Sequence, residues 1–403
     1  MFTLVFTYKS PNGILEYEII EEEKGEKYIS LKKSANAIGD MIIPSTINDI
    51  PVKRIGPAAF YANSELTSIV IPNTVNTIEH TAFGFCESLK NVELSENLKE
   101  LSISLFTNCS SLESIKIPKN VSVINDYAFE YCESLKSVQF NEKLKEIGIG
   151  AFFKCDIREL NFPDSLVEIR MDAFNLSGVE KITCGTSLKT INNGAFAECE
   201  RLESVSFNDG IEIIDDHAFT LCYNLKTFIM PDSLLSLGHG AIDSCLSLEH
   251  VHIGKNTEIK RTIGGFCNGC PALRDISISD GNENYVLEKG VLYNNTKNVL
   301  IKMAPKSPYK NIIIPESVTK VYQHAMSDIN GKTLRFKNTS LVGISESSIS
   351  LGKNILVYCH ENSDIEEFCK RKGIKYSIFS KLNDFLIDIA DDTKNLEDSI
   401  GNN

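Results

Sequence analysis

A phenylalanine recurs at an almost constant interval through most of this 403-residue chain. Successive positions are 22 to 24 residues apart, and the two intervals that end at Phe174 and Phe196 measure 22. Because a unit this short cannot bury its own apolar side chains, the period predicts a solenoid in which each coil packs on the next. The positions, which include one isoleucine, are Phe60, Phe83, Phe106, Phe129, Phe152, Phe174, Phe196, Phe219, Ile242 and Phe266.

Other residues keep their places relative to that phenylalanine. An alanine precedes it in most copies, a cysteine follows three residues later in seven, and a leucine usually comes three residues after the cysteine. A segment such as "LKNVEL" then alternates, with Val92 and Leu94 on one side of a strand and Asn91 and Glu93 on the other. A turn often written with Pro and Asn or Asp follows. The pattern predicts parallel strands that pair from coil to coil, constant interior rows and an outer face that is free to vary.

The complete unit, apolar-P-x-x-[LV]-x-x-I-x-x-x-A-F-x-x-C-x-x-L-x-x-[VI]-x-[IL], resembles the leucine-rich repeats of the BspA type. The match runs almost continuously from Ile42 to Leu287 and returns at 312–326. The resemblance implies a right-handed, strand-rich superhelix with its parallel strands on the concave face. It also implies short helical or 3-10 turns at the Ala-Phe-x-x-Cys segments. Two departures are Leu105 in the place of an alanine and Ser177 in the place of a cysteine.

The ends of the chain differ from the repeats. Alternating stretches such as "LEYEII" near the start predict strands that cover the first repeat, whose edge would otherwise pair with other chains. The end holds six acidic residues with apolar residues at helical spacing, which predicts a frayed, partly helical tail. The expected parts are a strand-rich cap at 1–41, the repeats at 42–330 with a strand-rich insertion at about 281–310, a C-terminal cap at 331–380 and the acidic tail at 381–403.

The repeated cysteine is best explained as a small apolar residue in an interior row, packed near the preceding phenylalanine. One catalytic thiol would not need seven copies, and a row of disulfides would be interrupted by Ser177. We therefore expect free thiols, which are typical of a reducing compartment. The seven are Cys86, Cys109, Cys132, Cys155, Cys199, Cys222 and Cys245.

Cys267 and Cys270 form the only C-x-x-C of the chain, the spacing of half a zinc site or of a redox pair. No second pair follows at zinc-ribbon spacing, so core packing is the favoured interpretation, and metal binding and redox cycling stay open. His250 and His252 would bind a metal only if a third ligand joined them. We predict no metal and no cofactor.

Several function classes are disfavoured. The 41 basic and 54 acidic residues give a net charge of −13, which disfavours nucleic-acid binding. No apolar stretch reaches 18 residues, and "MFTLVFTYKS" lacks the features of an export signal, so neither membrane insertion nor export is predicted. No nucleophile triad, phosphate loop or pair of carboxylates stands out, so we do not expect an enzyme.

The outer face of the strands is the candidate binding surface, because solenoids usually bind other macromolecules there. Its residues are mostly small and polar, without the aromatic anchors that are common in tight interfaces, so a modest affinity for a protein or glycan is expected. We expect a monomer. The candidate residues are Asn91, Glu93, Lys116, Gln139, Glu159, Asn161, Lys181, Thr183, Ser206, Ile229, His250 and His252.

Two functions of different class follow. The resemblance implies an adhesin-like module, since BspA-type proteins are similar to surface adhesins that bind extracellular-matrix or other host proteins. The expected free thiols and the missing export signal favour a cytoplasmic scaffold or regulator instead. Both would use the same outer face, and the location stays open between the cytoplasm and the cell surface.

Overall fold

The computed structural model describes residues 4–23, 25–34, 36–260, 266–341, 348 and 354–379. The chain divides into two compact units. The array unit comprises residues 1–262, 266–270 and 277–283, and the C-terminal unit comprises residues 263–265, 271–276 and 284–403. The acidic tail predicted at 381–403 lies outside the described residues.

The array unit begins with a sheet that covers the edge of its first coil. β1, β2 and β3 are antiparallel, and β3 then pairs in parallel with β6. β4 pairs in parallel with β7, the first long strand of the repeats. These strands occupy an edge that would otherwise be open to another chain. Their bounds are β1 (Phe6–Ser10), β2 (Gly13–Glu21), β3 (Lys27–Leu31), β4 (Gly39–Ile42), β5 (Thr46–Ile47), β6 (Ile50–Ile55) and β7 (Leu66–Val70).

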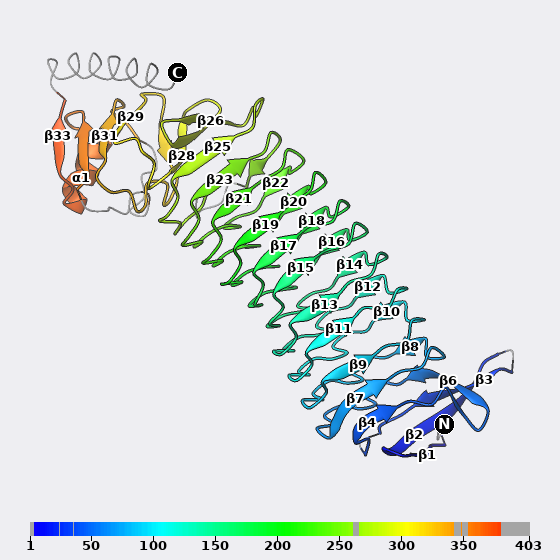
Figure 1. Cartoon of the computed structure of the whole chain (residues 1–403). Helices are drawn as coiled ribbons and strands as arrows, with labels where there is room; N and C mark the ends of the chain where they lie inside the picture. Colours follow the sequence, from blue (N-terminus) through cyan, green and yellow to red (C-terminus); the bar gives the residue numbers. More distant parts are fainter. Residues whose placement is uncertain are drawn as a thin grey trace, which may run out of the picture. The chain divides into compact units, whose positions relative to one another are not determined.

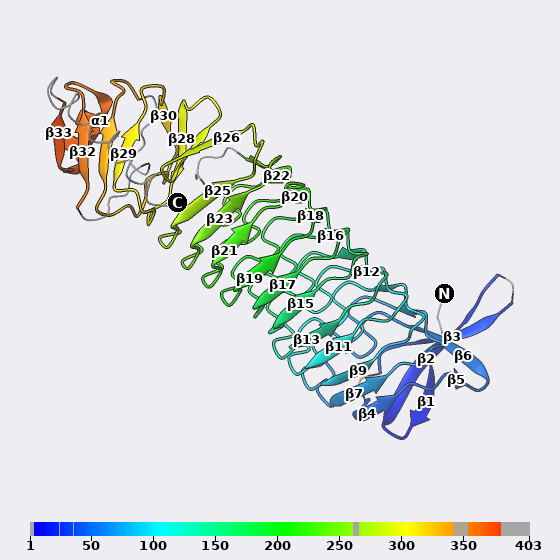
Figure 2. The same cartoon turned by 45° about the horizontal axis from the view of Figure 1, so that its top comes forward.

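Two rows of short parallel strands then run along the unit, blue to green in Figure 1 and again side by side in Figure 2. The register advances by one repeat at each step, as where Ser114 pairs with Ser137. This arrangement confirms the predicted solenoid of parallel strands. The first row continues from β7 with β9 (Asn91–Glu93), β11 (Ser114–Lys116), β13 (Ser137–Gln139), β15 (Glu159–Asn161), β17 (Lys181–Thr183), β19 (Ser204–Ser206), β21 (Thr227–Ile229), β23 (His250–Ile253) and β25 (Asp275–Ile278).

The second row consists of two-residue strands on the other side of each coil. Each contributes one buried isoleucine or leucine, the residue that leads into the next Ala-Phe segment. These strands are β8 (Thr77–Ile78), β10 (Glu100–Leu101), β12 (Val123–Ile124), β14 (Glu146–Ile147), β16 (Glu168–Ile169), β18 (Thr190–Ile191), β20 (Ile213–Ile214), β22 (Ser236–Leu237) and β24 (Glu258–Ile259).

The Ala-Phe segments correct one detail of the sequence prediction: they are successive tight turns rather than short helices or 3-10 turns. In one coil Thr81 and Phe85 have φ of 56° and 61°, in the left-handed region, and most other coils repeat this. Left-handed residues interrupt a helical backbone. Alternate amides then point to the next coil, as where the Phe83 N–H donates to the Leu105 carbonyl at 3.0 Å.

The repeated phenylalanines form one continuous stack inside the array unit. From Phe60 to Phe219 each side chain is fully buried, and neighbouring ring centroids are 5.1 to 5.4 Å apart with interplanar angles of 5° to 17°. Each ring between Phe60 and Phe219 touches the ring of the coil before it and the ring of the coil after it. The stack therefore couples every coil to its two neighbours.

The repeated cysteines lie in the interior, as predicted, and each thiol also forms a specific contact. The Sγ of each of the seven lies 3.1 to 3.3 Å from the carbonyl oxygen of the repeated phenylalanine one coil earlier. All twelve cysteines of the chain are buried, and none of them forms a disulfide. A buried thiol is a small apolar group with one weak donor, which suits a site facing a single carbonyl.

The first coil has an asparagine in the place of that cysteine. Asn63 is buried, and its Nδ2 donates to the carbonyl oxygen of Ala37 at 2.8 Å. No repeated phenylalanine precedes this coil, so a longer polar side chain reaches the backbone of the cap instead. In the next coil, the Cys86 thiol resumes the regular contact with the Phe60 carbonyl at 3.1 Å.

The C-terminal unit contains two further sheets and the helix α1. One sheet has the order β26-β27-β28-β30 and the other the parallel order β29-β31-β32-β33. Ser363 caps α1 by accepting the Glu366 N–H, and Gly373 ends it with φ of 67°. The bounds are β26 (Tyr285–Glu288), β27 (Val291–Asn294), β28 (Val299–Met303), β29 (Asn311–Ile314), β30 (Lys320–Val321), β31 (Thr333–Phe336), β32 (Leu356–Cys359), α1 (Asp364–Lys372) and β33 (Tyr376–Ile378).

The predicted boundaries at 41, 330 and 380 stay predictions. The segment expected as an insertion at about 281–310 contains β26, β27 and β28, which form antiparallel pairs. Within the part of the chain that the structure describes, no helix is long and apolar enough to cross a membrane.

Candidate binding site

The twelve candidate residues all lie on first-row strands of the array unit, between β9 and β23. We call the outward side of these strands the strand face. Ten of the twelve are exposed, among them Ile229 with 53% of its surface accessible, whereas His250 and His252 are half-buried. Their outward position follows from the alternation of the strands, because the intervening residues face the core. Their role in binding stays a prediction.

One hollow opens beside the strand face at β9 and β11. It has a volume of about 350 Å³, and its lining includes Val70, Pro72, Glu93, Lys116 and Pro118. The Lys116 Nζ lies 3.7 Å from a carboxylate oxygen of Glu96, another lining residue. The structure thus brings together two candidate residues, Glu93 and Lys116, that are 23 positions apart in the sequence.

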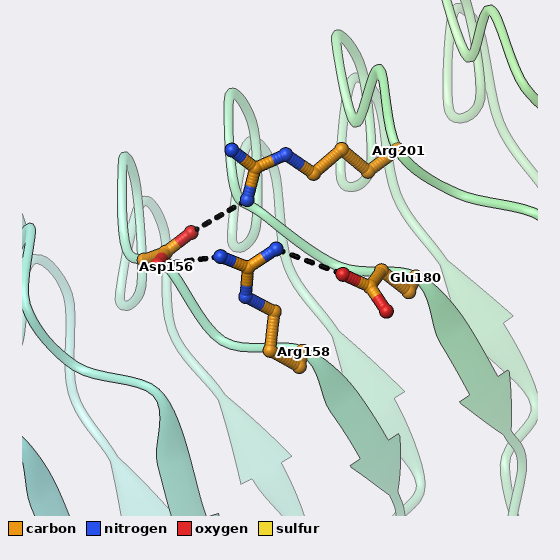
Figure 3. Close-up of polar contacts among 4 residues, drawn as sticks. All are labelled: Asp156, Arg158, Glu180 and Arg201. Atoms are coloured by element: carbon orange, nitrogen blue, oxygen red, sulfur yellow. Dashed lines mark hydrogen bonds and ion pairs between the residues drawn. The ribbon is translucent and has the colours of Figure 1, made fainter.

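A second group of polar residues lies at the start of β15, β17 and β19. Figure 3 shows the Arg158 guanidinium between two carboxylates, with 2.8 Å to Glu180 Oε1 and 3.0 Å to Asp156 Oδ2. The other oxygen of Asp156 accepts from Arg201 Nη1 at 3.0 Å. The hydrogen bond to Glu180 raises the pKa of Arg158 above its ordinary value. We call these four residues the Asp156 cluster.

The Asp156 cluster lies where two repeats are one residue shorter than the others. In a regular coil the leucine follows the cysteine by three positions, as Leu135 follows Cys132. In a shortened coil the corresponding apolar residue follows by two positions, as Ile157 follows Cys155. Gly178 lies in the second shortened turn, and a Cβ placed on it would meet Asp156 Oδ1 at 2.5 Å. A larger residue at this position would therefore displace the Asp156 carboxylate from its place in the cluster.

A hollow of about 530 Å³ lies beside the Asp156 cluster. It is an open depression with mostly polar walls, and it contains both ends of the Asp156–Arg201 ion pair. Its lining residues are Glu133, Lys154, Cys155, Asp156, Leu176, Ser177, Gly178, Glu198, Glu200 and Arg201.

Arg158 and Arg201 were missed as candidate residues, although a signal for them is present in the sequence. The two 22-residue intervals that end at Phe174 and Phe196 mark the shortened coils. Arginine is one of the residue types that contribute most to protein interfaces. Both arginines lie just before first-row strands, next to the strand face.

The two histidines of β23 bind serines in this structure. His252 Nδ1 lies 2.8 Å from Ser277 Oγ, and its Nε2 lies 2.9 Å from Ser279 Oγ. Ser279 donates its proton to Asp232 at 2.7 Å, so its oxygen accepts the Nε2–H of His252. The same bond is the main cause that lowers the pKa of Asp232. In the described residues no three His, Cys, Asp or Glu side chains are placed to hold a metal ion.

Cys267 and Cys270 are both buried. The Cys270 thiol lies 3.3 Å from the carbonyl oxygen of Ile242, so Cys270 occupies the place of the repeated cysteine despite its shift in sequence. Burial on this scale, combined with hydrogen bonding to backbone carbonyls, supports core packing over reactive thiol chemistry.

We expect native thiols to resist alkylation. In the folded chain at pH 7.5, iodoacetamide should leave Cys267 and Cys270 as unmodified as Cys132. The reason is that all three residues are at most 1% exposed. Mass spectrometry before and after unfolding in urea measures this, and the unfolded chain provides the positive control. Rapid labelling confined to Cys267 and Cys270 would contradict core packing and support a redox or metal role.

Comparison with known proteins gives a family and several similar structures. A family model described as BspA type leucine rich repeat region (6 copies) matches residues 53–179 and 167–298. No curated protein matches the chain. A leucine rich cell surface protein from Faecalibacterium prausnitzii is 24% identical, with 85% of this chain and 96% of that chain covered and a TM-score of 0.47. A leucine rich repeat protein from T. pallidum is 25% identical (52% and 87% covered, TM-score 0.40), and the pneumococcal vaccine antigen PcpA is 16% identical (94% and 100% covered, TM-score 0.43).

Proposed function

This chain belongs to the BspA-type leucine-rich repeat family, and on that premise we propose that it is a binding protein that holds another protein against its strand face. Proteins built from such repeats are generally interaction modules without enzymatic activity. The adhesin-like role that the family implies, with a host or extracellular-matrix protein as partner, is the specific form of this proposal.

The Asp156 cluster is the observation that carries the proposal. Arg158 and Arg201 are 39% and 51% exposed at their side chains, so a partner can reach them. Both guanidinium groups are already held by carboxylates, which lowers the conformational entropy that they lose when a partner binds. Between them and the Lys116 hollow, β11 to β19 present exposed side chains such as Gln139 and Asn161.

The function is tested by site-specific photocross-linking in the source cells. A photoreactive amino acid is placed at Asn161 on the strand face, and in a second chain at Val167, which is 39% exposed but lies outside the first row of strands. The proposal expects a discrete protein adduct from position 161 and none from position 167. Equal adducts from both positions, or none from either, would refute binding at the strand face.

Removal of both arginines should weaken the complex. For the captured partner, we expect Arg158→Ala with Arg201→Ala to raise the Kd at least about tenfold, which corresponds to about 1.4 kcal/mol. Arg170→Ala is the matched control, because Arg170 is also half-exposed and lies 3.5 Å from two carboxylates, those of Asp126 and Glu146, but lies next to a second-row strand. An equal loss in the control would show that the effect is not specific to the strand face.

A cytoplasmic scaffold is the second candidate function. The twelve cysteines favour it, because none forms a disulfide and chains in oxidising compartments seldom keep so many thiols in the reduced form. The cross-link from position 161 distinguishes the two candidate functions. A scaffold is expected to give an adduct with a cytosolic protein, and an adhesin is expected to give an adduct with a host or matrix protein.

A further inference from the structure

A hollow of about 620 Å³ lies in the C-terminal unit, within the volume range of small-molecule sites. Two loops form most of it, the one that joins β28 to β29 and the one that joins β30 to β31. Three prolines give it apolar walls. The lining residues are Pro271, Pro305, Lys306, Ser307, Pro308, Lys310, Asp328, Asn330, Gly331 and Lys332.

The charge of this hollow is opposite to that of the whole chain. It contains three lysines and one aspartate, whereas the chain has a net charge of −13. Lys306 and Lys310 are exposed, and neither makes an ion pair among the described residues. Unpaired ammonium groups around a concave surface concentrate the electrostatic field and attract anions.

Lys332 adds a buried cation that has no counter-ion among the residues that the structure describes. Only 3% of it is exposed, and its Nζ donates to the carbonyl oxygens of Ser307 at 3.1 Å and Tyr309 at 2.8 Å and to Ser307 Oγ at 3.0 Å. All three acceptors are neutral, and within the described ranges no carboxylate lies within ion-pair distance. Burial lowers the pKa of Lys332 below its ordinary value. A buried charge is normally paired with an opposite charge, because the loss of its hydration is costly.

The three hydrogen bonds of Lys332 also shape the hollow. They attach the start of β31 to residues 307–309, so both loops are held at fixed positions around the space between them. Because the donors of Lys332 are saturated, it contributes charge at short range, while Lys306 and Lys310 have hydrogen-bond donors left for a ligand.

We propose that this hollow binds a small organic anion through a carboxylate, sulfate or phosphate group. The anion supplies the counter-charge that Lys332 lacks and accepts hydrogen bonds from Lys306 and Lys310. The rings of Pro305 and Pro308 line the walls against an apolar part of the ligand. This site is independent of the strand face and of the proposed function.

The test is a titration of the full chain, labelled with ¹³C at the lysine Cε, with three probes: sulfate, phosphate and glucuronate. Chloride at equal ionic strength controls for screening. Binding predicts that the Lys306, Lys310 and Lys332 signals move together and saturate, with a Kd of about 1 mM or tighter for the best probe. The order of the three affinities identifies the anionic group. Shifts that do not saturate, or that chloride reproduces, would overturn the proposal.

Variants separate the site from general charge effects. Lys306→Gln with Lys310→Gln is expected to weaken binding of the best probe about tenfold or more, because two of the three cations are lost. Lys375→Gln removes an exposed lysine of the same unit that does not line the hollow, and it should leave the Kd unchanged. Both chains are first checked for unchanged thermal unfolding. Equal Kd values for the double variant and the control would contradict the assignment.

Discussion

Replacement of Phe129 by alanine is expected to lower the free energy of unfolding by about 3 to 5 kcal/mol. The Phe129 ring is fully buried, with ring centroids of Phe106 and Phe152 at 5.4 and 5.1 Å on its two sides. Its removal leaves a cavity that stacked neighbours cannot fill, because each ring is held in its own coil. Chemical denaturation with urea, followed by circular dichroism, measures the loss.

Gln139→Ala is the control for the same repeat. Gln139 is exposed on the strand face, so its truncation is expected to change the free energy of unfolding by less than about 0.5 kcal/mol. Phe129→Leu keeps most of the buried volume and should cost less than Phe129→Ala. Equal effects of Phe129→Ala and Gln139→Ala would overturn the assignment of interior and outer faces.

A rise in pH above about 9 is expected to destabilise the array unit strongly. Burial raises the pKa of the Cys86, Cys184 and Cys199 thiols to about 12, from an ordinary value of 9.0. Burial is also the main cause that raises the pKa of Cys132 and Cys222. Since the folded pKa exceeds the unfolded one, this stability is complete below pH 9 and is lost as the pH rises toward the folded pKa.

The size of this effect follows from the number of thiols. Each such thiol lowers the stability of the fold above pH 9, because the unfolded chain releases that proton more readily than the folded chain does. Eight cysteines of the array unit have raised pKa values, so their effects on stability act in the same direction. We therefore expect the free energy of unfolding to fall progressively as the pH rises above about 9.

The cysteine variants give the decisive measurement. Cys132→Ala should reduce the slope of unfolding free energy against pH by about half a proton at pH 9 and by nearly one at pH 10, and Cys132→Ala with Cys222→Ala by twice as much. The slope isolates titration from any change in packing, because packing losses are the same at every pH. An unchanged slope in both variants would show that thiol ionisation does not drive the alkaline transition.

The 22- to 24-residue period predicted the interior rows of the array correctly, because the same position of each coil is buried. The inward place of Phe129 follows from the constant interval of the repeated phenylalanine, and the outward place of Gln139 follows from the alternating segment after it. The backbone of the Ala-Phe segments was predicted wrongly, since left-handed residues such as Phe85 are not residue types that demand a positive φ. Their conformation is selected by hydrogen bonds to the next coil, which is a tertiary effect.

The polar sites could not be predicted in the same way. Arg201 and Asp156 are 45 positions apart, two coils away from each other, and their ion pair depends on a one-residue deletion in each of two turns. In the C-terminal unit, Lys332 contacts Ser307 across 25 positions, a spacing that differs from the period of 22 to 24 residues in the array. Such contacts depend on loop geometry that a hydrophobic period does not encode.

The thiol contacts also bear on how a chain of this kind changes length during evolution. In each regular coil the cysteine thiol donates to the phenylalanine carbonyl of the preceding coil, and the phenylalanine carbonyl accepts from the thiol of the following coil. A duplicated coil inserted between two regular coils can therefore form both hydrogen bonds. Its ring likewise enters the stack without a new side chain elsewhere. The first coil is different, because its Asn63 side chain donates to the Ala37 carbonyl of the cap and not to a phenylalanine carbonyl. Gain or loss of whole coils is therefore nearly neutral in the interior of the array, whereas the coil of Asn63 must remain first.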